Sequence, residues 1–374
     1  MSTPDDSTFI SPWSLTRTAD HGAASARGSL VIAACAAGRE LAAAVAGRYR
    51  ELSAASSSEQ PEGGERAGDL PVVLTDIEHS FSDTESSIRL PCHVGGSDVF
   101  LLQCLYDPDR GVGVNQNYLA FLLAARAFRE NGAAHVTAVL PYLAYARQDK
   151  PTKLSREPTS ARLLADLSIE AGIDGLIAWA PHSTQIRGFY GRIPVHLLDP
   201  LNMFLREFER FRGQEQVLAV APDAGAAKMI SHFGRELEVD FAVASKRRPR
   251  PEAVEITSVI GDFSGKTIAV VLDDMISTGG TVDSVIQELL GRTGIREVHL
   301  AAGHNLCRPK ALERIQELRE HWGLVSFVTT DSVPQSEDFR RLPYFHVRSL
   351  RDMLCRTINR VHYGRSVSEL FLRD

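Results

Sequence analysis

The residues best suited to chemistry follow an apolar segment near position 270. The stretch 270–282, VVLDDMISTGGTV, ends a predicted strand in two acids, Asp273 and Asp274, and leads through a small-residue turn into a predicted helix. Glycines let backbone N–H groups approach an anion closely, and a helix N-terminus favours negative charge. Adjacent carboxylates suit sugar hydroxyls, directly or through a divalent ion. The turn consists of Ser277, Thr278, Gly279, Gly280 and Thr281.

This turn could also be an ordinary strand–turn–helix with an acidic cap. The paired acids before S-T-G-G-T make that alternative the weaker one, and we predict an anion site with sugar-binding carboxylates. The hydroxyls of Thr278 and Thr281 can add hydrogen-bond donors to the backbone N–H groups.

Two further groups of residues, each with basic side chains, could bind phosphates. Arg147 and Gln148 follow a predicted strand, where a guanidinium can hold phosphate oxygens and an amide can donate to them. Lys246, Arg248 and Arg250 stand beside prolines, so they are not one face of a helix. A mobile cationic loop at this position could close over a triphosphate and neutralise charge at the β-phosphorus. A surface salt bridge and a solvated basic loop are the respective alternatives.

The elements that must position these residues alternate along the chain. Short apolar runs, many of them β-branched, are separated by amphipathic stretches of helical length, which is typical of α/β units with a mainly parallel sheet. Continuously apolar strands indicate sheets covered on both faces. The predicted strands are 30–34, 99–103, 136–140, 176–179, 217–221, 268–272, 298–301 and 324–328. The clearest predicted helices are 116–130, 162–171 and 281–290.

These elements divide into two sheets, and the chain of 374 residues is long enough for two domains. We predict a flexible tail over 1–27, an N-terminal domain over 28–200 and a C-terminal domain over 201–345. The segment 53–69 has no aliphatic residue larger than alanine, and we predict a disordered insertion there. Residues 346–374 are predicted to form a helix and tail that pack on the N-terminal domain.

The composition excludes several classes of protein. The net charge is −6, which gives no general electrostatic attraction to nucleic acid or anionic lipid. The five cysteines form no C-x-x-C pair, so neither a disulfide framework nor a structural zinc site is indicated. No uncharged apolar run is long enough to span a bilayer, and the N-terminus does not resemble a secretory signal. We expect a cytoplasmic enzyme.

The turn at 277–281 resembles the phosphoribosyl-pyrophosphate loop that phosphoribosyltransferases and ribose-phosphate pyrophosphokinases share. Other segments resemble the pyrophosphokinases in particular, and the resemblance covers roughly residues 29–373 in order, apart from the insertion at 53–69. They are FSDTE at 81–85, LPYLAYARQDK at 140–150, SREPTS at 155–160, APDAGAA at 221–227, SKRRPRP at 245–251 and HYGRSVSELF at 362–371. Thr84 stands in the first of these where the family has glycine.

The resemblance implies two phosphoribosyltransferase-like domains, each a mainly parallel sheet flanked by helices. It implies transfer of the β,γ-pyrophosphoryl group of ATP to the C1 hydroxyl of ribose 5-phosphate, with Mg²⁺ as cofactor. Lys246 and Arg248 would act on the transition state, and the 273–281 segment would bind ribose 5-phosphate. The residues implied for ATP are Phe81, Asp83, Glu85, Arg147, Gln148 and Asp149. Because the 81–85 segment reaches the ATP of a neighbouring subunit in that family, a homo-oligomer is implied.

The sequence departs from the family at the expected metal site. WAPHSTQIRGFY at 179–190 resembles the family's D-L-H-x-x-Q-I-Q-G-F-F, but Ala180 stands where the family has an acid. His182 and Asp223 are retained, and the resemblance implies that they share a divalent ion. Gly191 or Arg192 and His196 occupy positions where relatives often carry aspartates. Ser277 replaces another acid, although a serine hydroxyl can still bind ribose or phosphate.

Two other functions remain open. A non-catalytic paralogue that binds nucleotides and assembles with an active enzyme is favoured by Ala180 and opposed by the intact Lys246 and Asp273. A phosphoribosyltransferase would share the loop, but the segments at Phe81 and Arg147 argue against it. We predict no nucleic-acid or membrane partner.

Overall fold

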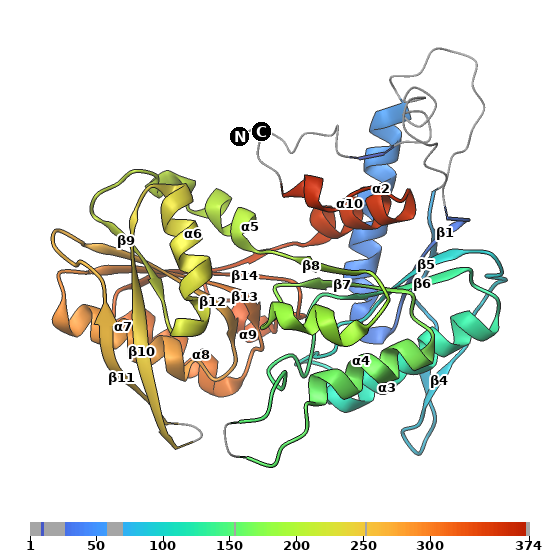
Figure 1. Ribbon diagram of the computed structural model, residues 1–374, viewed down its shortest axis with the longest axis horizontal. Helices are drawn as coiled ribbons and strands as arrows, with labels where there is room; N and C mark the ends of the chain where they lie inside the picture. The colour runs from blue at the N-terminus through green and yellow to red at the C-terminus, as the bar shows by residue number, and fades with distance from the viewer. Residues whose placement is uncertain (1–8, 11–26, 58–69, 153–154, 251–252, 372–374) are drawn as a thin grey trace. The chain divides into compact units, whose positions relative to one another are not determined.

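The computed structural model describes residues 9–10, 27–57, 70–152, 155–250 and 253–371, with backbone alone at 57, 246–250 and 253–258. The chain forms two compact units: Met1–Leu198 together with Ser349–Asp374, and Asp199–Arg348. Each is built on one sheet (Figure 1).

The first unit contains a six-stranded sheet in the order β2-β1-β5-β6-β7-β8, with every neighbouring pair parallel. Its strands are β1 Leu30–Ala34, β2 Val72–Leu74, β5 Asp98–Leu102, β6 His135–Leu140, β7 Gly175–Trp179 and β8 Val195–Leu198. All residues of β1, β5 and β7 are buried, which explains why these segments are apolar without alternation. Because β6 and β7 run parallel, the loops that follow them leave the sheet at the same edge.

The helices of this unit cover both faces of the sheet. They are α2 Arg39–Ser57, α3 Val114–Glu130, α4 Ser160–Ala171 and α10 Arg351–His362. The step from β1 to β2 runs opposite to the steps from β5 through β7, so right-handed crossovers place α2 on one face and α3 with α4 on the other. Helix α10 packs beside α2, where Arg48 Nε donates to Asp352 Oδ1 at 2.7 Å.

Two segments differ from the flexible regions that the sequence predicts. Helix α2 continues to Ser57 and so includes the first five residues of the predicted insertion; 58–69 lie outside the described residues. Of the predicted tail, residues 1–8 and 11–26 also lie outside the description, but Phe9 is buried. Its ring meets that of Tyr49 edge-on at 5.0 Å, and the Ile10 N–H donates to Asn359 Oδ1 at 2.8 Å. The ring contact of Phe9 and the hydrogen bond of Ile10 hold residues 9–10 against the first unit.

The second unit contains a seven-stranded sheet in the order β11-β10-β9-β12-β13-β14-β15. Its strands are β9 Val217–Ala221, β10 Asp240–Arg250, β11 Ala253–Ile260, β12 Ile268–Ile276, β13 Glu297–Asn305, β14 Leu324–Thr330 and β15 Phe345–Arg348. Only the pair β10–β11 is antiparallel. The mainly parallel sheets predicted from the sequence are thus confirmed in both units.

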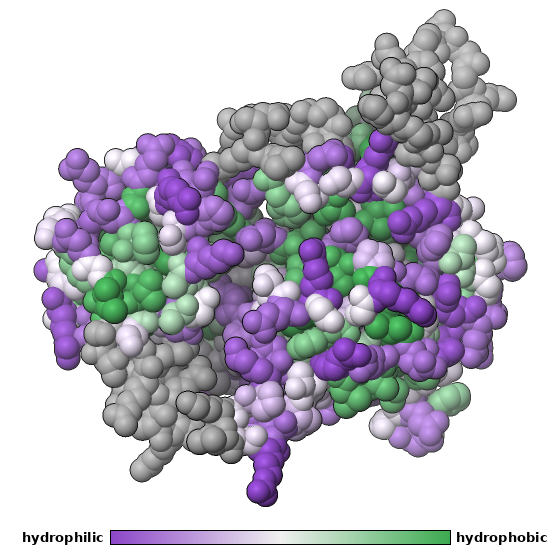
Figure 2. Space-filling view, in the orientation of Figure 1, coloured by the Kyte–Doolittle hydropathy of each residue, from purple (hydrophilic) through white to green (hydrophobic). Residues whose placement is uncertain are grey.

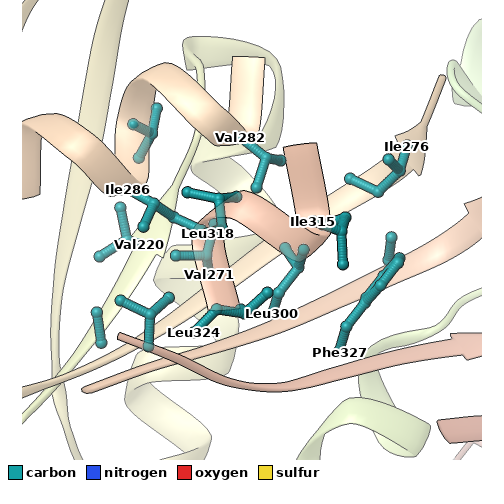
Figure 3. Packing of buried hydrophobic residues seen from close by; sticks show 14 of the residues in the cluster. Val220, Val271, Ile276, Val282, Ile286, Leu300, Ile315, Leu318, Leu324 and Phe327 are labelled. Carbon is teal, nitrogen blue, oxygen red and sulfur yellow. The ribbon is translucent and has the colours of Figure 1, made fainter. Parts of the chain in front are cut away.

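The core of the second unit lies on both faces of its sheet. Helices α7 Gly280–Arg292 and α8 Pro309–His321 pack on one face, where Val282, Ile286 and Ile315 meet side chains of the central strands (Figure 3). Helices α5 Leu201–Glu207 and α6 Ala227–Leu237 contribute the cluster on the other face, including Phe204 and Phe233. The turn between β12 and α7 is therefore anchored at both ends by buried elements.

Candidate functional site

The predicted phosphate loop joins two rigid elements of the second unit. β12 runs to Ile276 beside β13, α7 starts at Gly280, and the Asp283 N–H donates to the Gly279 carbonyl at 2.9 Å. Gly279 has φ +75°, a conformation that suits glycine. The loop therefore places backbone N–H groups and the hydroxyls of Thr278 and Thr281 at the N-terminus of a 13-residue helix, where an anion is favoured.

Three carboxylates lie at the same edge of the sheet. Asp273 and Asp274 belong to the end of β12, and Asp223 follows the neighbouring strand β9, where its Oδ1 accepts from the Gly225 N–H at 2.8 Å. Burial, then the charge of Asp274, and less strongly that of Asp223, raise the pKa of Asp273 well above its usual range. Concentrated negative charge of this kind favours a cation or a set of hydroxyl donors.

Arg314 is a member of this site that the sequence analysis missed. Its Nη1 donates to the carbonyl oxygen of Thr278 at 2.6 Å, from the second turn of α8. No motif marks Arg314, because its place at the loop arises only when α8 packs beside α7.

In the first unit, the residues predicted for ATP phosphates follow β6 at the carboxyl edge. Arg147 and Gln148 are exposed, whereas Asp149 is buried. The turn is tight, since the Gln148 N–H donates to the Tyr145 carbonyl at 2.9 Å and Tyr145 has φ +64°. Ser160, at the start of α4, donates to Gln148 Oε1 at 2.7 Å, which orients the Gln148 amide with its NH₂ group directed away from Ser160. The NH₂ group is thereby positioned as a donor.

The segment predicted to contact adenine forms a small hairpin. Strands β3 Glu78–Ser80 and β4 Ser86–Ile88 pair antiparallel, and Phe81 at the tip is 60% exposed. Asp83 Oδ1 accepts from the Glu85 N–H at 3.2 Å within the turn. Such an exposed aromatic ring is not part of the unit's own core.

The predicted metal ligands His182 and Asp223 fall in different units. His182 is exposed and follows β7, while Ala180 beside it is 4% exposed with φ +40°. Within the described residues there is no cluster of three or more His, Cys, Asp or Glu side chains arranged to hold a metal. Magnesium is usually bound through one or two carboxylates together with substrate phosphates, so the acids around Asp273 fit such an ion.

The predicted basic loop proves to be a β-ribbon. The backbone of Lys246 pairs with Ile256 and that of Arg247 with Glu255, with register shifts in β10 on either side. The side chains of Lys246 and Arg248 lie outside the described residues. The ribbon differs from a loop because β11 supplies partners for the backbone of the basic run, a pairing that side-chain composition does not reveal.

The fold and site together define a protein with two phosphoribosyltransferase-like domains. Residues 30–172 match the model for the N-terminal domain of ribose phosphate pyrophosphokinase, and residues 203–320 match that for the phosphoribosyl transferase domain. The chain is 35% identical over 309 residues to a ribose-phosphate pyrophosphokinase of Caldanaerobacter subterraneus subsp. tengcongensis, covering 82% of this chain and 93% of the relative.

A ribose-phosphate pyrophosphokinase of Fusobacterium nucleatum is 33% identical over 309 residues, 82% of this chain and 92% of the relative. Among solved structures, phosphoribosylpyrophosphate synthetase from Mycobacterium smegmatis matches with a TM-score of 0.74 and 29% identity, over 90% of this chain and 99% of that one. The chain belongs to the ribose-phosphate pyrophosphokinase family, and the resemblance read from its sequence is confirmed.

Among the helices in the described part of the chain, none has the length and apolar character needed to cross a membrane. The five cysteines all lie in the described part of the chain; none of them forms a disulfide, and four are buried.

Proposed function

We propose that the chain transfers the β,γ-pyrophosphoryl group of ATP to the C1 hydroxyl of ribose 5-phosphate, which yields phosphoribosyl pyrophosphate and AMP. The observation that carries this proposal is the pair Asp273 and Asp274 directly before a glycine turn at the N-terminus of α7. The acids would hold the ribose hydroxyls, and the turn from Ser277 to Thr281 would hold the 5-phosphate.

The nucleotide side of the proposal rests on the first unit. Arg147 and the oriented amide of Gln148 would bind the phosphates of ATP, with Asp149 beside them. Phe81 would stack on adenine, and Asp83 and Glu85 would accept from its amino group. Lys246 and Arg248 would stabilise charge that develops on the transferred group, because phosphoryl transfer needs positioning and charge neutralisation more than covalent catalysis.

The family is ATP-dependent, and we propose Mg²⁺ as the ion of this chain. Asp223 and the acids at the end of β12 would hold it, and the family resemblance names His182 as a further ligand. When bound, the ion would supply positive charge to the phosphate oxygens.

We further propose a homo-oligomer in the cytoplasm, with each ATP site completed by the hairpin of a neighbouring subunit. Four leucines on the neighbouring helices α3 and α4 are exposed, and Figure 2 shows apolar surface over this helix pair. They are Leu119, Leu123, Leu163 and Leu167. Their pairs lie at i and i+4, so each helix presents both of its leucines on one side.

The cysteine thiols, none of which forms a disulfide, are consistent with a reducing compartment.

Release of AMP from ATP in the presence of ribose 5-phosphate and Mg²⁺ tests the activity. We expect AMP and phosphoribosyl pyrophosphate in equal amounts. ATP binding without AMP release at any Mg²⁺ or Mn²⁺ concentration would support the non-catalytic paralogue, which Ala180 favours. Consumption of phosphoribosyl pyrophosphate with a nucleobase would instead indicate a phosphoribosyltransferase.

A further inference from the structure

Arg314 links the phosphate loop to the helix packed beside it. Besides its hydrogen bond to the Thr278 carbonyl, its Nε lies 3.8 Å from Asp283 Oδ2 in the first turn of α7. The side chain is one-third exposed, at 32%. One guanidinium group therefore contacts the loop just before its glycines and the helix just after them.

We propose that Arg314 is a positioning residue, which turns the peptide unit between Thr278 and Gly279 so that its N–H faces the anion. In a trans peptide, the C=O and N–H groups lie in one plane and point in opposite directions. Since Arg314 holds the Thr278 carbonyl toward α8, the Gly279 N–H is directed away from α8. This inference rests on the proposed function, which places the 5-phosphate at this loop.

The packing around the glycines supports this role. A Cβ atom at Gly280 would lie 3.2 Å from Arg314 Nη1, and one at Gly279 would lie 3.6 Å from the Cα of Ala311. The loop thus rests directly on α8, and the guanidinium fills the space that a side chain at Gly280 would need. Without Arg314, the Thr278 peptide would lose the contact that opposes its rotation.

The same helix offers a matched control. Arg319, also in α8, donates through Nη1 to the carbonyl of Leu324 at 2.9 Å, and its guanidinium lies 5.3 Å from the Tyr344 ring centre. Leu324 begins β14, so this carbonyl lies at the amino edge of the sheet, opposite to the phosphate loop. Replacing Arg319 removes the same kind of bond from the same helix without touching the loop.

The test titrates ribose 5-phosphate calorimetrically into protein that holds Mg²⁺ and a non-reacting ATP analogue. Losing the arginine–carbonyl bond should weaken ribose 5-phosphate binding by about tenfold in Arg314→Met. Arg314→Lys keeps one donor and should fall between this variant and wild type, whereas Arg319→Met should bind as wild type does. In steady-state assays, the KM for ribose 5-phosphate should rise in Arg314→Met while the KM for ATP stays unchanged.

Thermal unfolding of all four proteins separates positioning from stability. If Arg314→Met binds as tightly as wild type, or if Arg319→Met loses the same affinity, Arg314 has no specific effect on the loop and the proposal is overturned. If wild type binds ribose 5-phosphate but releases no AMP, the proposed activity fails while the positioning role is still tested by the affinities. If wild type does not bind the sugar phosphate at all, both inferences fail.

Discussion

Asp98 and His362 are both fully buried and are joined by a hydrogen bond of 2.8 Å between Oδ2 and Nδ1. Asp98 begins β5 and His362 ends α10, so the bond ties the returning C-terminal helix to the central sheet of the first unit. Because His362→Ala leaves the buried carboxylate without this donor, we expect the free energy of unfolding to fall by roughly 2–3 kcal/mol.

Urea-induced unfolding checks this expectation. His321→Ala provides the control, since His321 ends α8 and is exposed. A surface change of this kind should shift the free energy of unfolding by less than about 0.5 kcal/mol. Equal unfolding midpoints for His362→Ala and wild type would show that the bond does not hold α10 in place.

The central strands were predictable because burial on both faces requires continuous apolar runs. The strands predicted over 30–34 and 217–221 coincide with β1 and β9. The short edge strands β2 and β15 were missed, because three or four partly exposed residues carry little pattern. The strand predicted over 268–272 continues in the structure to Ile276, since Met275 pairs with His304 of β13. That pairing depends on the neighbouring strand, which local composition does not record.

The residues of the candidate site also divide into those that local sequence predicts and those that depend on tertiary packing. Residues next to one another in a motif, such as Asp273 to Thr281, could be found from the sequence because the chemistry and the turn are local. Arg314 could not, since it lies 36 residues from the carbonyl that it contacts. The paired backbone of β10 and β11 was hidden for a different reason: the proline and the run of charges in β10 are typical of loops.

The hairpin turn at Thr84 carries backbone strain that glycine would relieve. Thr84 has φ +75°, and its N–H donates to the Phe81 carbonyl at 3.0 Å. Left-handed backbone costs a non-glycine residue about 1–2 kcal/mol, partly offset by the greater chain entropy of glycine. Thr84→Gly should therefore slow hydrogen exchange of the Phe81 amide about two- to fivefold through a more stable hairpin. Thr84→Ala keeps the strain, so the same slowing in both variants would exclude this explanation.

Asp273 should make the free protein less stable as pH rises. Its pKa is raised on folding by burial, then by Asp274 and Asp223, so the folded state retains a proton that the unfolded state has lost. The stability that this proton provides is present below the unfolded pKa of about 3.9 and is lost as pH rises through the folded pKa. Relative to wild type, Asp273→Asn should thus gain stability between pH 4 and pH 7.5, while its affinity for ribose 5-phosphate falls.

Urea unfolding in EDTA across this pH range measures the effect. Asp262 gives a control without a trend in this range, since the Ser264 N–H lowers its pKa and its titration lies below pH 4. Its contribution to stability is fully present above the unfolded pKa of about 3.9 and is lost only as pH falls below that value, so Asp262→Asn should differ from wild type by a nearly constant amount between pH 4 and pH 7.5. Parallel curves for Asp273→Asn and wild type would contradict the assignment.

The position of Ala180 permits a direct test of the metal site. Ala180 is 4% exposed and has φ +40°, a region that Asp and Asn adopt more readily than alanine. A carboxylate introduced there would be buried, so it should destabilise the protein unless a cation lies close to it. If position 180 adjoins the Mg²⁺ site, Ala180→Asp should lower the free Mg²⁺ needed for half-maximal activity at fixed MgATP by at least about threefold, because it adds an oxygen ligand.

Ala180→Asn matches the variant in shape and backbone preference but lacks the charge, so it should leave the Mg²⁺ requirement close to that of wild type. Thermal unfolding adds a readout without turnover: Mg²⁺ should raise the midpoint of Ala180→Asp more than that of Ala180→Asn. Overlapping Mg²⁺ curves for Asp and Asn would remove position 180 from the metal site. Turnover in Ala180→Asp together with none in wild type would make the non-catalytic paralogue the better description of this chain, because a single carboxylate would then separate it from an active enzyme.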